Sequence, residues 1–261
     1  MEELRAWKPI VSVIMPAYNA QRYLAQAIRS LQAQTFTQWE LIVVDDCSGD
    51  DTAQIVSQLA QADPRIRLYR NEQNLGAAKS RNRGLELQEG EFVAFLDSDD
   101  VWRPKKLELQ VDYMRQTNAD LTYTAYAIMD AQGRKAFQDY LVPLEVDFDG
   151  LLKQNVIGCS TAMLRGEVAK KYRFSEEFYH EDYVLWLEML RDGCTAAGLR
   201  EVLVEYRFHE QSKAGNKTKA AAMRWQIYRD YLGLSLPKSI WYFAHYGLSG
   251  LRKYRKTKDN Q

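Results

Sequence analysis

Three carboxylates stand within four residues, directly after an apolar stretch of the chain. The apolar stretch covers residues 92–96, and Asp97, Asp99 and Asp100 follow it. Because its odd and even positions are both apolar, the stretch is typical of a strand that is buried on both faces of a parallel sheet. Ligands of open α/β sheets bind beyond the carboxyl ends of the strands, so we expect these carboxylates at the mouth of a site.

The spacing of the carboxylates suits a divalent cation. Side chains alternate along an extended strand, so Asp97 and Asp99 would point to the same face. Converging carboxylates repel each other unless a positive group joins them, and oxygen ligands favour a hard cation such as Mg²⁺ or Mn²⁺. Such ions are commonly held by one or two carboxylates together with substrate phosphates. The alternative is that these acids only close the strand or cap the helix near Pro104.

Strands and helices alternate through the first hundred residues, and this alternation must position the acidic turn. It predicts right-handed βαβ units and a mostly parallel sheet. Asn19, after the first strand, is a candidate N-cap for the next helix, and Asp45, after the second, is expected to be a structural turn residue. The predicted strands are residues 11–15, 40–44, 66–69 and 92–96, and the predicted helices cover residues 20–33, a stretch from near residue 51, and residues 77–87.

The second half of the chain is less regular. Residues 130–133 have the composition of a hairpin turn, and residues 134–150 are expected to form a loop-rich excursion with one weak strand. The remaining predictions are a helix from Pro104 to about Arg115, strands at residues 121–126, 160–164 and 202–207, a helix from Glu181 to Gly193, and a helical tail to residue 261.

The composition of the 261 residues excludes several classes of protein. Thirty-five basic and 35 acidic residues give no net charge, so no nucleic-acid partner is expected. The three cysteines, Cys47, Cys159 and Cys194, form no CxxC pair, and their scatter favours a reducing cytoplasm. No stretch approaches the roughly 18 apolar residues of a membrane span. The absence of GxGxxG after the first strand and of GxxxxGK[ST] argues against a dinucleotide oxidoreductase and a P-loop kinase.

Five motifs in order resemble the signature of the family-2 glycosyltransferases with the GT-A fold. They are residues 13–19 (VIMPAYN), 43–48 (VVDDCS), 74–76 (NLG) with Arg81 and Asn82, 95–100 (FLDSDD) and 181–182 (ED). In particular, the chain is similar to the non-processive transferases of bacterial surface-polysaccharide assembly, including those of teichuronic acid and capsule. The resemblance covers residues 10–210 and implies an α/β, Rossmann-like, mostly parallel sheet flanked by helices. It divides the chain into an N-terminal arm of residues 1–9, a nucleotide-binding half of residues 10–103, an acceptor half of residues 104–210, and a C-terminal helical, basic tail of residues 211–261.

The resemblance implies that these motifs bind a UDP-sugar donor. Tyr18 would lie against the uracil ring, and the short turn from Pro16 to Asn19 leaves room for the base. Asp46 would accept a hydrogen bond from uracil N3–H, and Arg81 would steer the base or the diphosphate. Tyr18 and Arg81 would otherwise be ordinary packing or surface residues. The other implied contacts are Asp97 on the ribose, Ser98 beside it, Asp99 on the Mn²⁺ or Mg²⁺ that bridges the diphosphate, and His209 near that metal or, alternatively, in a plain polar loop.

The transfer chemistry also requires a base. In a single displacement, the acceptor hydroxyl loses its proton as it attacks the anomeric carbon, and a carboxylate within hydrogen-bond reach can take that proton. The metal would stabilise the leaving UDP as a Lewis acid. The resemblance implies the role of base for Asp182, which follows Glu181 at the start of a helix. The alternative is that both acids only favour the helix N-terminus through the macrodipole.

Three functions compete for these motifs. The first is an inverting, metal-dependent glycosyltransferase that moves one sugar from a UDP-sugar to a hydroxyl of a glycan or lipid-linked glycan acceptor. A sugar nucleotidyltransferase would need a Gly- and Arg-rich loop after the first strand, and residues 16–19 are not one. A non-catalytic carbohydrate-binding or scaffold protein should lack Asp99 and Asp182. Processive synthases of the family carry Gln-x-x-Arg-Trp and membrane spans; here Arg224-Trp225 lacks the Gln, so we set the pair aside.

The tail combines aromatic stripes with positive charge. From Lys238 onward, six Lys or Arg against one Asp give a net charge of +5, although the whole chain is neutral. Aromatics beside a basic cluster predict peripheral contact with the inner face of the cell membrane. The alternative is that they pack on the catalytic part or on a second subunit, which would make a homodimer. The aromatic and apolar residues are Trp225, Tyr228, Tyr231 and Leu232 on one helix, and Trp241, Tyr242, Phe243, Tyr246, Leu248 and Leu251 on a second helix after Pro237.

Overall fold

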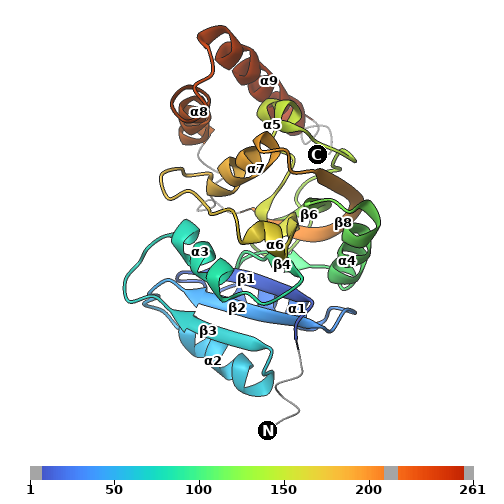
Figure 1. The fold of residues 1–261 in the computed structure, drawn as a ribbon. Helices are drawn as coiled ribbons and strands as arrows, with labels where there is room; N and C mark the ends of the chain where they lie inside the picture. The colour runs from blue at the N-terminus through green and yellow to red at the C-terminus, as the bar shows by residue number, and fades with distance from the viewer. Residues whose placement is uncertain (1–7, 209–216, 256–261) are drawn as a thin grey trace.

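One curled sheet runs through most of the chain (Figure 1). The computed structural model describes residues 8–208 and 217–255. In these residues the strands are β1 (Val11–Ala17), β2 (Trp39–Asp45), β3 (Ile66–Arg70), β4 (Phe92–Phe95), β5 (Val101–Trp102), β6 (Leu121–Met129), β7 (Met163–Arg165) and β8 (Ala196–Arg207). Their order in the sheet is β3-β2-β1-β4-β7-β6-β8-β5. The first four strands pair in parallel, β6 and β8 also pair in parallel, and β7 is antiparallel between β4 and β6. The predicted α/β class and mostly parallel sheet are therefore confirmed.

Helices cover both faces of this sheet. The long helices are α1 (Leu24–Gln32), α2 (Thr52–Ala62), α3 (Ala77–Leu87), α4 (Lys106–Thr117) and α7 (Glu181–Arg191). Shorter elements are α5 (Phe148–Lys153), α6 (Gly166–Ala169) and the 3-10 turn η2 (Cys159–Thr161). The C-terminal part contains α8 (Lys217–Gln226), the π-helical turn η4 (Ile227–Tyr231) and α9 (Leu236–Arg255).

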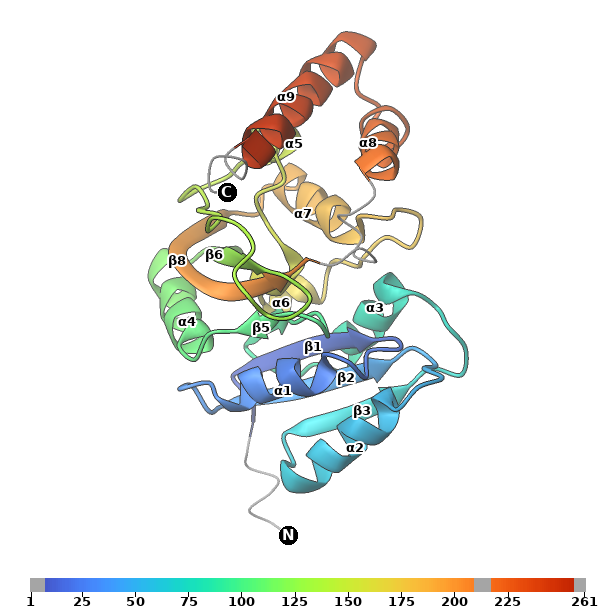
Figure 2. The same cartoon turned by 180° about the vertical axis from the view of Figure 1, so that it is seen from behind.

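Alternate residues of β1 supply two hydrophobic cores, one on each face of the sheet. Val13 and Met15 pack with α1, α2 and α4, whereas Ile14 packs with α3 and α7. Helix α1 lies nearer to the viewer than the sheet in Figure 2, which shows the molecule from behind. Because both faces are covered, β1, β2 and β4 are buried along almost their whole length, which explains the long apolar runs in these strands.

Helix α3 approaches β1 closely because it carries a glycine at the contact. A Cβ added to Gly84 would lie only 2.4 Å from Cγ2 of Ile14, so a larger residue would push the helix or that side chain away. Arg81 lies three residues earlier and therefore on the same side of α3. The close contact brings its guanidinium over the sheet, near the carboxyl ends of the strands.

The tail packs on the body of the protein through its inner side. The Tyr228 hydroxyl donates a hydrogen bond of 2.6 Å to the Leu152 carbonyl, and the rings of Tyr231 and Phe178 lie 5.1 Å apart. Tyr228 and Tyr231 therefore pack on the catalytic part of the chain, which was the alternative to membrane contact. Four apolar side chains on the outer side of α9 stay exposed: Leu236, Ile240, Trp241 and Leu248. Side chains beyond Leu248, including Leu251 and the basic cluster, lie outside the description. Among the described residues, no helix combines the length and apolar character needed to cross a membrane.

Several local predictions differ from the structure. Asn19 does not cap α1, which begins at Leu24; it has a left-handed φ of 48° instead, and its backbone N–H donates to the Ser48 hydroxyl. Residues 160–161 belong to η2 rather than to a strand, and β8 begins at Ala196 rather than at residue 202. The expected weak strand within residues 134–150 is reduced to isolated bridges. The short elements β5, α5 and α6 were not predicted, because they are too brief to show a period.

Candidate active site

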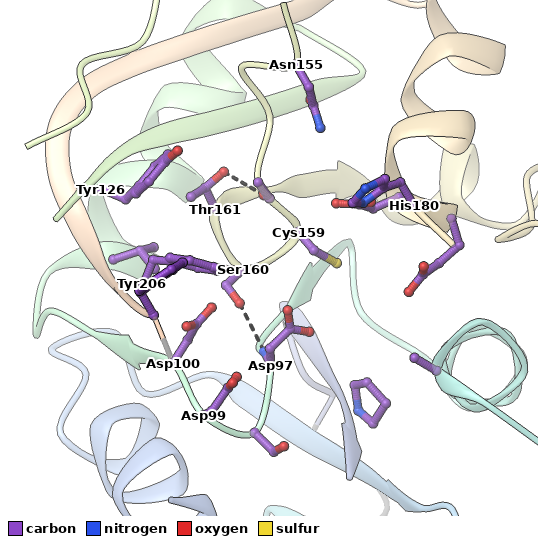
Figure 3. A pocket seen from close by; sticks show the side chains of 18 of the residues that line it. Asp97, Asp99, Asp100, Tyr126, Asn155, Cys159, Ser160, Thr161, His180 and Tyr206 are labelled. Atoms are coloured by element: carbon purple, nitrogen blue, oxygen red, sulfur yellow. Dashed lines mark hydrogen bonds between the residues drawn. The ribbon is translucent and has the colours of Figure 1, made fainter. Parts of the chain in front are cut away.

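A cavity of about 1460 Å³ opens where the strands β1, β4 and β8 end and α7 begins. Figure 3 shows its acidic floor, with Tyr126 and Tyr206 on one side and His180 on the other. The residues predicted from the sequence that line it are Pro16, Tyr18, Asn19, Asp46, Arg81, Asp97, Ser98, Asp99 and Asp182. His209, predicted near the metal, lies outside the described residues. The fold thus brings together in one cavity residues that are spread over more than 160 positions of the chain.

The acidic turn after β4 is held by an arginine from β8. The Arg207 backbone N–H donates to Oδ1 of Asp100 at 2.9 Å, and its Nε donates to the Asp99 carbonyl at 2.8 Å. Its Nη2 reaches Oε1 of Gln26 on α1 at 2.8 Å. Arg207 is almost fully buried, so these bonds are shielded from water. The side chain therefore fixes the backbone of the turn that carries the carboxylates.

The carboxylates of this turn crowd one another. Asp100 is buried, and burial, together with the neighbouring charges of Asp99 and Asp97, raises the pKa of its carboxyl well above its ordinary value. Its Oδ2 has no hydrogen-bond partner among the described residues. An excess of buried negative charge is the condition that a divalent cation relieves, and carboxylate oxygens are suitable ligands for Mg²⁺ or Mn²⁺. Within the described residues, no three His, Cys, Asp or Glu side chains form a complete metal site, so the turn would need substrate oxygens to complete one.

Arg81 connects this turn to the first turn of α7. Its Nη2 lies 2.5 Å from Oδ1 of Asp97, and its Nη1 lies 2.5 Å from Oε1 of Glu181. Arg81 and Glu181 are both buried, which makes this pairing stronger than one at the surface. The guanidinium is therefore occupied by two carboxylates in this structure, and it neutralises part of the negative charge beside the cavity.

Asp182 follows Glu181 and, like it, lines the cavity, but Glu181 is the acid that pairs with Arg81. Both acids occupy the first turn of α7, as the macrodipole favours, and Oδ1 of Asp182 accepts the Tyr183 backbone N–H at 2.8 Å. The neighbouring Cys159 is buried in the cavity wall, and burial raises the pKa of its thiol. A thiol that keeps its proton cannot accept one from a substrate, so Asp182 is the better candidate for a general base here.

The other end of the cavity is formed by the loops after β1 and β2. Tyr18 is 53% exposed, so its ring is available to a ligand. Asn19 Oδ1 accepts the Gly49 N–H at 2.9 Å, which ties the two loops together. Asp46 is buried, and its two oxygens accept the backbone N–H groups of Leu75 at 2.9 Å and Gly76 at 2.7 Å. Asp46 therefore shapes the loop before α3 as well as lining the cavity.

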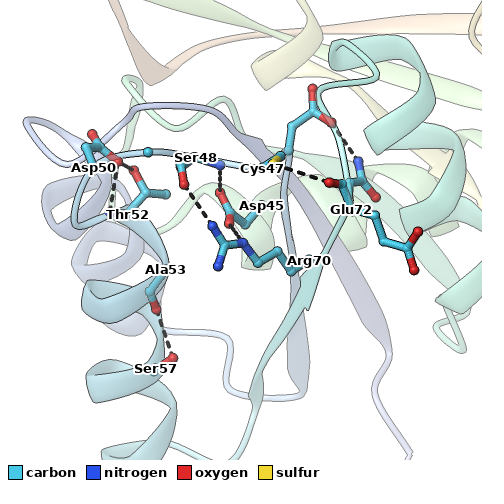
Figure 4. Close-up of polar contacts among 12 residues, drawn as sticks. Asp45, Cys47, Ser48, Asp50, Thr52, Ala53, Ser57, Arg70 and Glu72 are labelled. Carbon is cyan, nitrogen blue, oxygen red and sulfur yellow. Dashed lines mark hydrogen bonds and ion pairs between the residues drawn. The ribbon is translucent and has the colours of Figure 1, made fainter.

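Asp45 has the structural position expected from the sequence. It is fully buried, and its Oδ2 lies 3.1 Å from Nε of Arg70 (Figure 4). The same arginine donates from Nη2 to the Ser48 carbonyl at 2.8 Å, and the Ser48 N–H donates to Oδ1 of Asp45 at 3.2 Å. This closed set of bonds holds the loop after β2, on which Asp46 stands.

Two parts of the cavity wall were missed by sequence reasoning. The rings of Tyr126 and Tyr140 stack with centroids 4.9 Å apart, and Nε2 of Gln154 donates to the Tyr140 hydroxyl at 2.7 Å. The tail supplies the other part, through Ala220, Ala221, Arg224, Tyr246 and Gly247. Tyr140 lies in an irregular loop with no sequence signal, whereas the Arg224-Trp225 pair was noted and set aside.

Comparisons with known proteins agree with this geometry. The profile of the family described as Glycosyl transferase family 2 matches residues 12–207. The chain is 38% identical over 247 residues to a putative teichuronic acid biosynthesis glycosyltransferase, TuaG of Bacillus subtilis, covering 95% of this chain and 98% of that one. It is 36% identical over 247 residues to WfgD of Escherichia coli, a UDP-Glc:alpha-D-GlcNAc-diphosphoundecaprenol beta-1,3-glucosyltransferase, covering 94% and 95% of the two chains.

Solved structures agree with the fold. Residues 1–349 of S. aureus TarS in complex with UDP superpose with a TM-score of 0.66 at 22% identity, covering 87% of this chain and 76% of that one. The mannosyltransferase PcManGT of Pyrobaculum calidifontis, in complex with GDP-Man and Mn2+, gives a TM-score of 0.69 at 18% identity, covering 88% and 66%. At these identities the likeness establishes the fold, which is the GT-A fold expected from the sequence.

Proposed function

The chain belongs to glycosyltransferase family 2, and from that membership we propose that it moves one sugar from a UDP-sugar to a hydroxyl of a surface-polysaccharide acceptor. The observation that carries this proposal is the convergence of the predicted donor residues and Asp182 on one cavity. The relatives named for teichuronic acid biosynthesis and for a diphosphoundecaprenol acceptor support a surface glycan as the product and a lipid-linked acceptor. Neither a nucleotidyltransferase nor a non-catalytic scaffold is needed to explain the site.

The donor nucleotide occupies the part of the cavity formed by the loops after β1 and β2. We assign the uracil to the exposed ring of Tyr18, within the turn from Pro16 to Asn19. The carboxylate of Asp46 is buried at this end, where it can accept the uracil N3–H, a donor that cytosine lacks. Asp97 and Ser98 stand at the start of the acidic turn and line the cavity, and we assign the ribose to them.

The diphosphate lies at the acidic turn, where the carboxylates must be neutralised before an anion can approach. We propose that Asp99 holds Mn²⁺ or Mg²⁺ there, with His209 as a further ligand. The bound ion would neutralise the developing charge of the leaving diphosphate. Asp97 remains paired with Arg81, and Arg207 keeps the turn in place during the reaction. The chain's own contribution is thus a rigid, negatively charged turn that is ready for a cation.

The acceptor hydroxyl approaches from the side of α7. Asp182 takes its proton as the oxygen attacks the anomeric carbon, and the leaving group departs from the opposite face, so the reaction inverts the configuration at that carbon. The stacked rings of Tyr126 and Tyr140 give an aromatic surface of the kind that suits one face of a sugar ring. We also propose that the outer side of α9 lies on the inner face of the cell membrane, where a lipid-linked acceptor would be presented.

The test of this proposal joins nucleotide binding with transfer. The parent protein should bind UDP in the presence of Mn²⁺ and lose most of that affinity in EDTA, because the diphosphate and the carboxylates repel each other without a cation. Asp99→Asn should lose the Mn²⁺-dependent part of the affinity and all transfer. NMR of the product should show the inverted anomer. Equal UDP affinity with Mn²⁺ and with EDTA, measured by calorimetry, would rule out the metal-dependent site.

A further inference from the structure

A buried arginine of the tail stands in the cavity wall beside the first turn of α7. The Arg224 guanidinium carbon lies 3.6 Å from the ring centroid of Tyr183 and 4.8 Å from that of Tyr246 on α9. Its side of α8 also presents Ala220 and Ala221 to the cavity. Arg224 lines the same cavity, although it is only 6% exposed to solvent.

Arg224 differs from the other two buried arginines of the site in its partners. Arg81 is paired with two carboxylates, and Arg207 donates to several oxygens of the turns around it. Around Arg224 stand the tyrosines Tyr183, Tyr228 and Tyr246, and no carboxylate within the described ranges forms an ion pair with it. Its Nη1 has no hydrogen-bond partner there. A buried cation without a counter-charge is costly, so the missing anion is expected to come from a ligand.

The surrounding tyrosines hold the guanidinium in a fixed orientation. The Tyr183 hydroxyl donates to the Leu151 carbonyl at 3.2 Å, and the Tyr228 hydroxyl donates to the Leu152 carbonyl at 2.6 Å. Because each hydroxyl hydrogen is used on α5, the oxygen lone pairs remain to accept from Arg224. The planar guanidinium is thus stacked over the Tyr183 ring with the Tyr228 oxygen beside it, which restricts its orientation before an anion binds.

The position of Arg224 separates it from the donor site. Consecutive residues of a helix are about 100° apart, so Glu181 and Tyr183 point to nearly opposite sides of α7. Glu181 faces Arg81 and the acidic turn, whereas Tyr183 faces Arg224. Asp182 lies between the two sides, so an acceptor hydroxyl at Asp182 would have the donor on one flank and Arg224 on the other.

We propose that Arg224 binds the phosphate that links the acceptor sugar to its lipid, one sugar ring away from the hydroxyl that reacts at Asp182. This inference rests on the proposed function and adds an anion subsite for the acceptor to it. Arginine binds phosphate oxygens with two parallel hydrogen bonds, which suits a free Nη1 beside a cavity. The wall next to Arg224 belongs to α9, whose outer side carries the exposed apolar residues. A phosphate at this place would therefore lie on the lipid side of the acceptor sugar.

Calorimetry on protein saturated with UDP and Mn²⁺ tests the subsite apart from the donor site. The probes are glucose 1-phosphate and N-acetylglucosamine 1-phosphate, each compared with its neutral sugar. The parent protein should prefer at least one of the sugar phosphates over its neutral sugar. Arg224→Gln should weaken binding of that sugar phosphate by roughly tenfold or more, as expected for the loss of charge-assisted hydrogen bonds. Its affinity for UDP should stay within about twofold of the parent.

Two further variants control for charge and folding. Lys219→Gln removes one positive charge from the same helix, but Lys219 lies over the Tyr179 ring and does not line the cavity, so the sugar phosphate should bind as in the parent. Arg224→Lys keeps the charge and loses the planar fork, so it should show an intermediate loss. If thermal unfolding shows that Arg224→Gln does not fold, the affinity of Arg224→Lys for the sugar phosphate is the test instead.

Three results would overturn the inference. In the first, the parent protein binds sugar phosphates no better than neutral sugars. In the second, Arg224→Gln, or Arg224→Lys in its place, keeps the full affinity for the sugar phosphate. In the third, the variant loses UDP affinity instead, which would assign Arg224 to the donor diphosphate. Failure of the proposed function itself would show separately, as a parent protein that binds no UDP.

Discussion

Two neighbouring acids at the start of α7 have different partners and therefore different roles. Both line the cavity, but Glu181 is buried and paired with Arg81, whereas Asp182 is partly exposed. The sequence predicted both acids but not their different partners, because it does not show which of them forms an ion pair with Arg81. If Asp182 is the base, its carboxylate must accept a proton from the acceptor hydroxyl, and the neighbouring glutamate cannot replace it while it remains paired with Arg81.

Asp182→Asn should therefore keep the affinity for the donor and lose turnover. General-base catalysis contributes on the order of 10²–10⁴-fold, so kcat should fall within that range. Asparagine has nearly the same shape and keeps an oxygen for the Tyr183 N–H, so the fold should be unaffected. The measurements are UDP binding by calorimetry and the initial rate of transfer. Transfer within a few-fold of the parent would mean that a different residue is the base.

The raised pKa of Asp100 predicts how stability depends on pH. Above its ordinary pKa of 3.8 the carboxyl is ionised in the unfolded chain, while the folded protein favours the protonated form. The folded state then loses stability as pH rises from the ordinary value towards the raised one, and this cost remains at higher pH. Asp100→Asn removes the buried charge and keeps an oxygen for the Arg207 N–H.

In EDTA, Asp100→Asn should therefore raise the melting temperature more at pH 8 than at pH 4. A difference of roughly 2–4 °C would correspond to about 1 kcal/mol in a chain of this size. The measurement is thermal unfolding of the variant and the parent at both pH values. An equal change at both pH values would show that the carboxyl carries no charge cost in the fold.

At the scale of the element, helix α9 has two sides with different surroundings. Its inner side packs on α5 and the tail aromatics, and its outer side leaves Leu236, Ile240, Trp241 and Leu248 exposed. The sequence alone could not show which apolar residues of α9 are buried and which are exposed. Its aromatic and apolar residues lie on two adjoining faces of the helix, and their spacing predicts one broad apolar face. The division restricts the membrane hypothesis to the outer side and to the positive charge that follows it.

Replacing Ile240 and Trp241 together by serine should weaken binding to vesicles of anionic phospholipid. Both side chains are more than half exposed, so the fold should tolerate the change. Sedimentation with vesicles at low and high salt measures the effect, and high salt should reduce binding because the basic residues contribute about 1 kcal/mol each. Leu75→Ser, on the loop between β3 and α3, is the matched control and should sediment like the parent.

If the parent does not bind vesicles at low salt, or if the double variant binds equally well, the outer side of α9 does not contact lipid. A measurement of mass in solution would then show whether a second copy covers this side, as the homodimer hypothesis requires. Dimerisation that is lost in the double variant would assign the side to a protein interface.

At the scale of the whole molecule, the fold could be predicted where the sequence has a regular hydrophobic pattern. Strands β1, β2 and β4 were predicted because each is buried on both faces, and their carboxyl ends share one edge, so Asp46 and Asp97 line the same cavity. The wall formed by Tyr140 and Arg224 could not be predicted, because it depends on an irregular loop and on how the tail folds back. The turn η2 was predicted as a strand because Ser160 and Thr161 directly precede the apolar residues of β7. Their helical turn depends on tertiary contacts that the sequence does not show, such as the hydrogen bond from the Asp97 N–H to the Ser160 hydroxyl.

The clamp of Arg207 on the acidic turn also determines when the site can form during synthesis. Its bond to the Asp99 carbonyl spans 108 positions of the chain. A ribosome adds about 5–20 residues per second, so the turn leaves the tunnel roughly 5–20 s before its clamp. The first βαβ units can fold in that interval, because their strands pair among themselves. In that interval we expect the nascent chain to contain a folded half whose acidic turn is not yet ordered, and the site is completed only when β8 docks.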